Sequence, residues 1–92
     1  MPTATLKIAP KARELIRRLP PILKRKVRAA LGELLDHPTV GKQLRKELTG
    51  YRSLRVGRHR VIYRADELGI EVVAIGPRAT VYEEIAREIT RR

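Results

Sequence analysis

The sequence predicts an α+β domain in which an antiparallel sheet carries a helical hairpin on one face. Three observations favour this fold. The first half of the chain repeats apolar residues at helical spacing, the second half alternates them as strands do, and the last stretch returns to helical spacing. A chain of 92 residues that is 42% apolar has room for one such domain, residues 1–92, with one hydrophobic core.

The first half of the chain is expected to form one short strand followed by two helices. Residues 5–8 alternate in polarity and indicate a strand. Pro10 can open a helix at its first turn, and residues 11–19 carry apolar side chains every three or four positions. The proline pair that follows ends this helix and starts the next, over residues 22–35. The outer face of the resulting hairpin is basic: Lys11, Arg13, Arg17, Arg18, Lys24, Arg25, Lys26 and Arg28.

The second half, after a polar connection, is expected to form three strands and a closing helix: residues 51–56, 59–64, 70–75 and 81–92. The three strands should form an antiparallel meander, with the first strand of the chain at its edge. Gly57 and Arg58 make a tight connection at which a bulge can form. Gly76 and Pro77 are expected to break the third strand.

The charge of the chain points to a polyanionic partner. The formal net charge is +11 at pH 7, which attracts phosphate backbones or acidic protein segments, and RNA is the favoured polyanion. The three tyrosines are too few aromatic residues for a single-strand binder built on base stacking. The absence of cysteine, of a long apolar run and of a signal-peptide layout predicts a cytoplasmic protein that does not bind membranes.

Metal and cofactor chemistry find no support in the sequence. His37 and His59 are the only histidines, and neither has a second ligand at useful spacing. Ser53 is the only serine, and nothing supports a catalytic triad around it. No phosphate-binding glycine loop or dinucleotide fingerprint is present. We therefore expect no metal and no small-molecule cofactor.

Arginine is the residue type that remains as a candidate for chemistry. Five arginines fall in the predicted strand pair: Arg52, Arg55, Arg58, Arg60 and Arg64. Arg78 follows the neighbouring strand and Tyr82 comes four residues later, so Arg60, Arg78 and Tyr82 can converge in a meander. Guanidinium groups match the geometry of phosphate groups. Arginines together with a tyrosine could therefore cleave RNA slowly without a metal, if the substrate is held well. The alternative is that these arginines form a solvated sheet face and that Tyr82 caps a helix.

Two segments of the sequence resemble a known family. Residues 44–63, LRKELTGYRSLRVGRHRVIY, resemble the central signature of the RelE/ParE toxin superfamily. Residues 73–78, VAIGPR, followed by Val81 and Tyr82, resemble its closing segment. The likeness covers nearly the whole chain.

The resemblance implies a toxin of a type II toxin–antitoxin system with the RelE-like fold, whose partner is an acidic, partly disordered antitoxin. RelE-type members act on the ribosome and cut mRNA without a metal, leaving a 2′,3′-cyclic phosphate. ParE-type members poison DNA gyrase and commonly lack the ribonuclease residues. We expect a ribosome-dependent mRNA endoribonuclease; a non-enzymatic gyrase inhibitor and an inactive RNA-binding relic are the alternatives.

The resemblance also implies roles for individual residues. Arg60 and Arg78 correspond to arginines that stabilise the phosphate, and Tyr82 to a tyrosine that stacks on or orients the substrate. We expect Arg52 to join them as a catalytic residue. The cations expected to contact RNA or the ribosome are Arg55, Arg58, Lys24, Arg25, Lys26 and Arg28.

The chain departs from the family pattern at the positions of a lysine pair, which Tyr51 and Ser53 occupy. Arg52 or Arg55 could substitute if the strand has a bulge. His59 stands where an aromatic residue is usual and could act as a base, but a regular strand would point it away from Arg60. The identity of the general base is therefore open.

Overall fold

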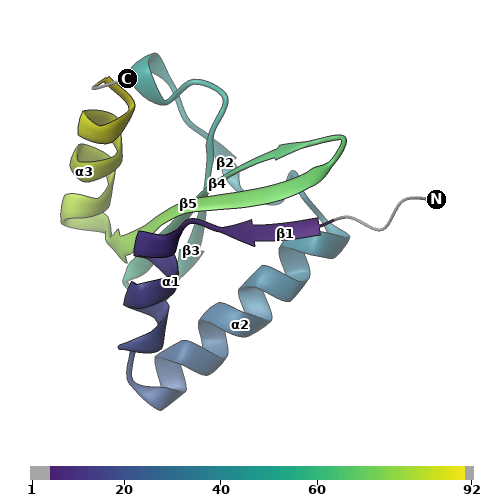
Figure 1. Ribbon diagram of the computed structural model, residues 1–92, viewed down its shortest axis with the longest axis vertical. Helices are drawn as coiled ribbons and strands as arrows, with labels where there is room; N and C mark the ends of the chain where they lie inside the picture. Colours follow the sequence, from purple (N-terminus) through teal and green to yellow (C-terminus); the bar gives the residue numbers. More distant parts are fainter. Residues whose placement is uncertain (1–4, 91–92) are drawn as a thin grey trace.

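Residues 5–90 are described by a computed structural model, in which five strands form one mixed sheet with helices on both faces (Figure 1). The elements in chain order are β1 (Thr5–Ile8), α1 (Pro10–Arg17), α2 (Pro21–Asp36), β2 (Lys42–Gln43), a 3-10 turn (Lys46–Leu48), β3 (Arg52–Val56), β4 (His59–Asp66), β5 (Gly69–Pro77) and α3 (Arg78–Thr90).

The sheet has the strand order β1-β5-β4-β3-β2. The predicted antiparallel meander of β3, β4 and β5 is confirmed, and so is the place of β1 at its edge, where it runs parallel to β5. At the other edge β2 pairs antiparallel with β3. The sequence analysis assigned β2 to a polar connection, because a strand of two residues carries no readable periodicity.

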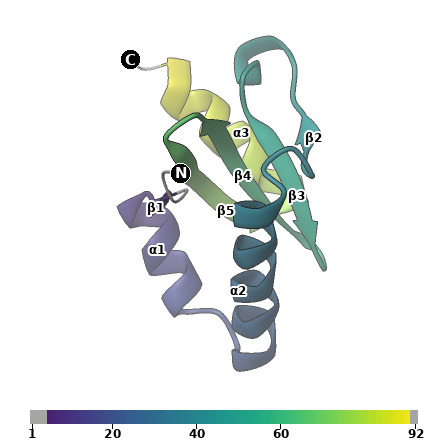
Figure 2. The ribbon, with the colours of Figure 1, turned by 90° about the vertical axis from the view of Figure 1, so that its right-hand side faces the viewer.

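The two faces of the sheet carry separate apolar clusters. The helical hairpin α1–α2 packs on one face, as predicted, and α3 packs on the other (Figure 2). Strand β4 serves both clusters: Val61 and Tyr63 lie under the hairpin, and Ile62 lies under Val81 and Ile85 of α3. A strand covered on both faces has no exposed side, which explains the unbroken apolar run in the middle of β4.

The helix boundaries follow the prolines. Helices α1 and α2 begin at Pro10 and Pro21, where the missing backbone N–H has no intrahelical partner to lose. The prediction that the strand breaks at Gly76 is wrong, because β5 continues through Pro77 and α3 starts at Arg78, three residues earlier than expected. Pro77 is tolerated as the last residue of the strand, since the chain turns into the helix directly after it.

The β3–β4 hairpin is regular from end to end. The register runs without a shift from the Arg52–Tyr63 pair to the Val56–His59 pair, so a bulge at Gly57 and Arg58 is not present. Gly57 has a φ of 62°, which suits the first position of a two-residue hairpin turn. The irregularity lies instead between β4 and β5, where the register shifts between Ile62 and Tyr63.

A hydrogen-bonded tyrosine fastens the loop before β2 to the sheet. The Tyr63 hydroxyl donates to the Pro38 carbonyl at 2.8 Å and accepts from the Gly41 N–H at 2.9 Å. The Tyr63 side chain is fully buried. A Cβ at Gly41 would come within 2.6 Å of the tyrosine oxygen, so this position has no room for a side chain. The loop and the strand β2 that follows it are therefore held against the sheet through Tyr63.

We predict that Tyr63→Phe lowers the free energy of unfolding at neutral pH by about 1–2 kcal/mol, because it leaves two backbone groups without their partner. Burial raises the pKa of Tyr63 above its ordinary value of 10.0, against the opposing effects of the Gly41 hydrogen bond and the Arg52 charge. Because the pKa is higher in the folded state than in the unfolded state, it contributes stability at pH values below about 10. This contribution is lost as the pH rises through the raised pKa of the folded state. Urea denaturation at neutral and alkaline pH measures the difference between wild type and variant. The difference in the free energy of unfolding between wild type and Tyr63→Phe should become smaller above about pH 10. A difference that stays the same across this pH range would show that the Tyr63 hydroxyl does not ionise less readily in the folded state.

Candidate functional site

Two arginines lie side by side at the hairpin end of the sheet. Arg55 of β3 pairs with Arg60 of β4, and Arg60 pairs in turn with Gly76 of β5. Residues paired across antiparallel strands project on the same face. Because Gly76 has no side chain, the side chain that flanks Arg60 in this row is that of Arg55. Neither guanidinium group takes part in an ion pair between described residues, so their terminal N–H donors are available for an anion.

A hydroxyl pair shows which face these arginines occupy. The Ser53 and Tyr82 hydroxyls share a hydrogen bond of 2.8 Å between β3 and α3. Ser53 is 4% exposed and Tyr82 is half-buried. Arg55 lies two residues after Ser53 on the same strand, so both project toward α3. The α3 side of the sheet therefore carries the arginine pair together with the Tyr82 hydroxyl.

The start of α3 is attached to the hairpin turn. The Arg78 backbone N–H donates to the Arg58 carbonyl at 3.3 Å, and the Arg55 Nε donates to the Gly57 carbonyl at 3.2 Å. Four arginines, from β3, the β3–β4 turn, β4 and the start of α3, therefore lie at one end of the sheet, and we call Arg55, Arg58, Arg60 and Arg78 the arginine face. Tyr82 follows Arg78 by about one turn of helix on α3. The meander thus brings the segments of Arg60, Arg78 and Tyr82 together, as the sequence led us to expect.

Arg52 lies elsewhere. It pairs with Tyr63, on the face that carries the helical hairpin, and its Nη1 donates to the carbonyls of Thr39 at 3.2 Å and Gly41 at 2.8 Å. A bulge that would turn Arg52 toward Arg60 is not present, because the β3–β4 register is unbroken. The structure therefore separates Arg52 from the arginine face and gives it a place in the same loop attachment as Tyr63.

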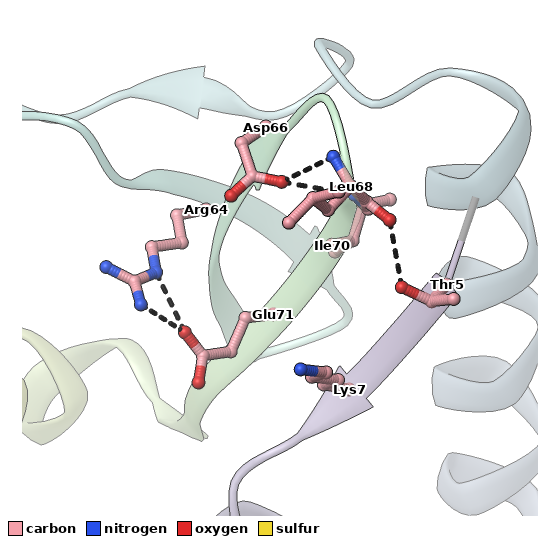
Figure 3. Close-up of a pocket in the computed structure, with 8 residues that line it drawn as sticks. Thr5, Lys7, Arg64, Asp66, Leu68, Ile70 and Glu71 are labelled. Carbon is pink, nitrogen blue, oxygen red and sulfur yellow. Dashed lines mark hydrogen bonds and ion pairs between the residues drawn. The ribbon is translucent and has the colours of Figure 1, made fainter. Parts of the chain in front are cut away.

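Two further residues from the sequence analysis also lie apart from the arginine face. His59 pairs with Pro77 and precedes Arg60, so strand alternation directs it to the opposite face. Arg64 is paired with Glu71 by two contacts of 2.7 and 2.8 Å at the far end of the sheet (Figure 3). Side-chain hydrogen bonding to Glu71 raises the pKa of Arg64 further above its ordinary value. Neither residue is available to a ligand beside Arg60.

The basic residues of α2 form a second positive area. These residues are Lys24, Arg25, Lys26 and Arg28. All of them except Lys24, which is half-buried, are exposed. Helix α2 packs on the opposite face of the sheet from α3, whereas Arg55 and Arg60 lie on the α3 side. The positive charge of the chain is therefore divided between two sides of the molecule.

Ser53 is the site residue that sequence reasoning missed. The sequence analysis treated it as an isolated serine and as the occupant of a position where the resemblance to the toxin superfamily implies a lysine. The available signal was its spacing from Arg55, which places both on one face of a strand. The hydrogen bond to Tyr82 had no signal in the sequence, because it depends on how α3 packs across the sheet.

The arrangement suits an anionic ligand. Guanidinium groups bind phosphate through charge-assisted hydrogen bonds, and a tyrosine hydroxyl can both donate and accept. Within residues 5–90, no three His, Cys, Asp or Glu side chains lie close enough to hold a metal ion. No helix in that part of the chain is long and apolar enough to cross a membrane.

Comparison with known proteins gives consistent matches. Residues 6–82 match the family described as the ParE toxin of the type II toxin–antitoxin system, parDE. The chain is 38% identical to toxin RelG of Mycobacterium tuberculosis over 82 residues, which cover 85% of this chain and 94% of that protein.

Solved structures agree with these matches. The toxin–antitoxin complex RelBE2 of Mycobacterium tuberculosis contains a chain with a TM-score of 0.73 and 34% identity, covering 83% of this chain and 99% of that one. The isolated RelE toxin of E. coli has a TM-score of 0.72 over 94% of this chain and 98% of that one. At 20% identity, the E. coli structure supports the fold.

We predict that Arg52→Met lowers the free energy of unfolding by about 1–2 kcal/mol, since the carbonyls of Thr39 and Gly41 lose a charged donor. Arg55→Met is the matched control on the same strand: its hydrogen bond to the Gly57 carbonyl is exposed, so water can replace it and stability should change by less than about 0.5 kcal/mol. Urea denaturation of both variants measures the difference. Equal stabilities would show that Arg52 does not hold the loop.

Proposed function

Because the chain belongs to the ParE toxin family of type II toxin–antitoxin systems, and is a RelE-like toxin within the RelE/ParE superfamily, we propose that it inhibits translation by cutting mRNA on the ribosome. The observation that carries this proposal is that Arg55 and Arg60 of the arginine face lie on the same side of the sheet as the Tyr82 hydroxyl. This combination offers cations for a phosphodiester and a group that exchanges protons.

The reaction needs only what RNA and these side chains supply. The 2′-oxygen attacks the adjacent phosphorus, the bond from phosphorus to the 5′-oxygen breaks, and the products are a 2′,3′-cyclic phosphate and a 5′-hydroxyl. One proton leaves the 2′-hydroxyl and one reaches the 5′-oxygen. Arg60 and Arg78 would stabilise the negative charge that develops on the phosphorane oxygens. A guanidinium is a poor base, so proton transfer would pass through the Tyr82 hydroxyl or through the substrate itself.

Dependence on the ribosome follows from the weakness of this chemistry. A site without a strong general base gains most of its rate from positioning, which can supply several kcal/mol of the barrier. The ribosome would hold the mRNA against the arginine face in a reactive geometry. The exposed cations of α2 would contact ribosomal RNA on the other side of the molecule. This role would place the protein in the cytoplasm, where ribosomes and mRNA are found.

The charge of the chain also supports a protein partner. The related RelBE2 structure is a toxin–antitoxin complex. We propose that an acidic, partly disordered antitoxin covers the basic helices and part of the arginine face. A net charge of +11 makes the chain repel itself, and an acidic partner would offset this repulsion. The same partner would keep RNA away from Arg60 and Arg78.

Inhibition of DNA gyrase is the second candidate function. One observation favours it: the matching family is described as that of the ParE toxin. The resemblance adds a second argument, since it implies a lysine pair where this chain has Tyr51 and Ser53. In this alternative the arginine face would bind a protein or DNA, and Arg60 would take no part in a reaction.

We predict that Arg78→Ala and Arg60→Ala each reduce mRNA cleavage by about 10²–10³-fold, since each removes a cation from the developing phosphorane charge. Primer extension on mRNA from translating ribosomes maps the cuts. Arg64→Gln is the control, because this exposed arginine is paired with Glu71 at the far end of the sheet. Growth arrest without phased cuts, together with inhibited supercoiling by gyrase, would replace the ribonuclease by the second candidate.

We predict that the untagged product of the adjacent gene co-purifies with the tagged chain and that rising salt concentration weakens the complex. Charge neutralisation drives the association, and salt screens it. Size-exclusion chromatography at low and high ionic strength measures the change. Recovery of the chain as a monomer at low salt would count against the antitoxin.

A further inference from the structure

We propose that Lys42 is a further phosphate-binding residue of this site, and that it supplies the cation on the β2 side of the Ser53–Tyr82 hydroxyl pair. The inference rests on the proposed function, since it concerns the RNA that the arginine face would bind. It assigns a role to an edge strand that the sequence analysis did not predict.

The strand register carries the proposal. Lys42 pairs with Ser53 across the β2–β3 ladder. Side chains of directly opposed residues lie on the same face, with Cβ atoms about 4.5–5.5 Å apart. Ser53 projects toward α3, because its hydroxyl is bonded to Tyr82. Lys42 therefore projects toward α3 as well, and its flexible four-carbon stem can carry the ammonium group to the hydroxyl pair.

The charges then lie on both flanks of the hydroxyl pair. Arg55 lies two residues beyond Ser53 on the same strand, and Arg60 is its partner on β4. Lys42 lies on the other side of Ser53, at the open edge of the sheet. A phosphate beside the Tyr82 hydroxyl would therefore meet guanidinium groups toward the hairpin turn and an ammonium group toward the edge. An extended RNA strand has a phosphate at each nucleotide, so separated cations of this kind can follow its backbone.

Lys42 is free to take this role. Its side chain is exposed, and the ion pairs between described residues involve Lys11, Arg17, Arg18 and Arg64 but not Lys42. An exposed lysine with no carboxylate partner keeps its charge available for an anion. The structural alternative is that Lys42 only protects the sheet edge from pairing with other chains, as lysines on edge strands often do.

The backbone is held on both sides of Lys42. Tyr63 and Arg52 bond the loop up to Gly41, and the Leu44 N–H donates to the Tyr51 carbonyl at 3.0 Å. A strand of two residues would not stay ordered through its own ladder alone. Tyr63 and Arg52, on the face that carries the α1–α2 helical hairpin, therefore position Lys42 on the α3 face. Arg52 thus acts on the site indirectly, through the position of Lys42.

Lys7 provides a matched control for a test. It is the other lysine on a described strand, and it is exposed. It lies on β1, the opposite edge strand of the sheet, near Glu71 (Figure 3). Lys7→Met and Lys42→Met remove the same charge from the same kind of element. Lys42→Arg keeps the charge and serves as the conservative variant.

The experiment measures single-turnover mRNA cleavage on ribosomes at saturating toxin, with thermal unfolding of each variant as the folding control. We expect Lys42→Met to reduce the rate by about 10–100-fold, less than the loss of a buried oxyanion donor, because the residue is exposed. Lys42→Arg should stay within about threefold of wild type, since it restores the cation. Lys7→Met should match wild type. Equal rates for Lys42→Met and Lys7→Met would overturn the proposal.

A binding measurement separates this inference from the proposed function. The logarithm of the affinity for a short single-stranded RNA is measured against the logarithm of the salt concentration. Loss of one phosphate contact should reduce the slope by about 0.7 for Lys42→Met and leave it unchanged for Lys7→Met. If wild type cuts no mRNA on ribosomes, the proposed function fails. An unchanged slope for Lys42→Met overturns the Lys42 contact whether or not cleavage occurs.

Discussion

The unbroken pairing of β3 with β4 is the constraint on which the rest of the molecule depends. Side chains in a regular strand alternate between faces, so one continuous register decides the side of every residue in the hairpin. Ser53, Arg55 and Arg60 project toward α3, whereas Arg52 and Tyr63 project toward the helical hairpin. A bulge of one residue would exchange these sets, which would bury an arginine of the site and expose a core tyrosine.

The side chains on the two faces of the β3–β4 strand pair have different roles, and those on one face position groups on the other. On the hairpin face, Tyr63 and Arg52 bond the loop between α2 and β2 through its backbone carbonyls and the Gly41 N–H. That attachment adds β2 to the sheet and brings Lys42 beside Ser53 on the other face. Tyr63 and Arg52 on the helical-hairpin side of the sheet thus position Lys42 on the α3 side. Gly41 is needed for this attachment, because its position has no space for a side chain.

The distribution of positive charge is suited to binding a polyanion. Within the arginine face, the Arg78 N–H bonds the Arg58 carbonyl, and the Arg55 side chain bonds the Gly57 carbonyl of the β3–β4 turn. The ion pairs between described residues involve none of the four arginines of this face: they join Glu14 to Arg17 and Arg18, Glu71 to Arg64, and Glu88 to Lys11. An uncompensated cluster of this kind repels itself, so a phosphate backbone or an acidic protein would stabilise it.

The sequence by itself determined the order of the elements, the meander, the edge position of β1 and the family. These features depend on local periodicity, prolines and short motifs that survive without tertiary contacts. It also predicted that Arg60, Arg78 and Tyr82 lie on adjoining segments, because a meander leaves few other arrangements. Only the tertiary structure decided that Arg52 serves the loop, that Ser53 bonds Tyr82 and that Lys42 stands beside them. The reason is physical: a residue's face depends on a register, and the register depends on contacts between strands that are distant in sequence.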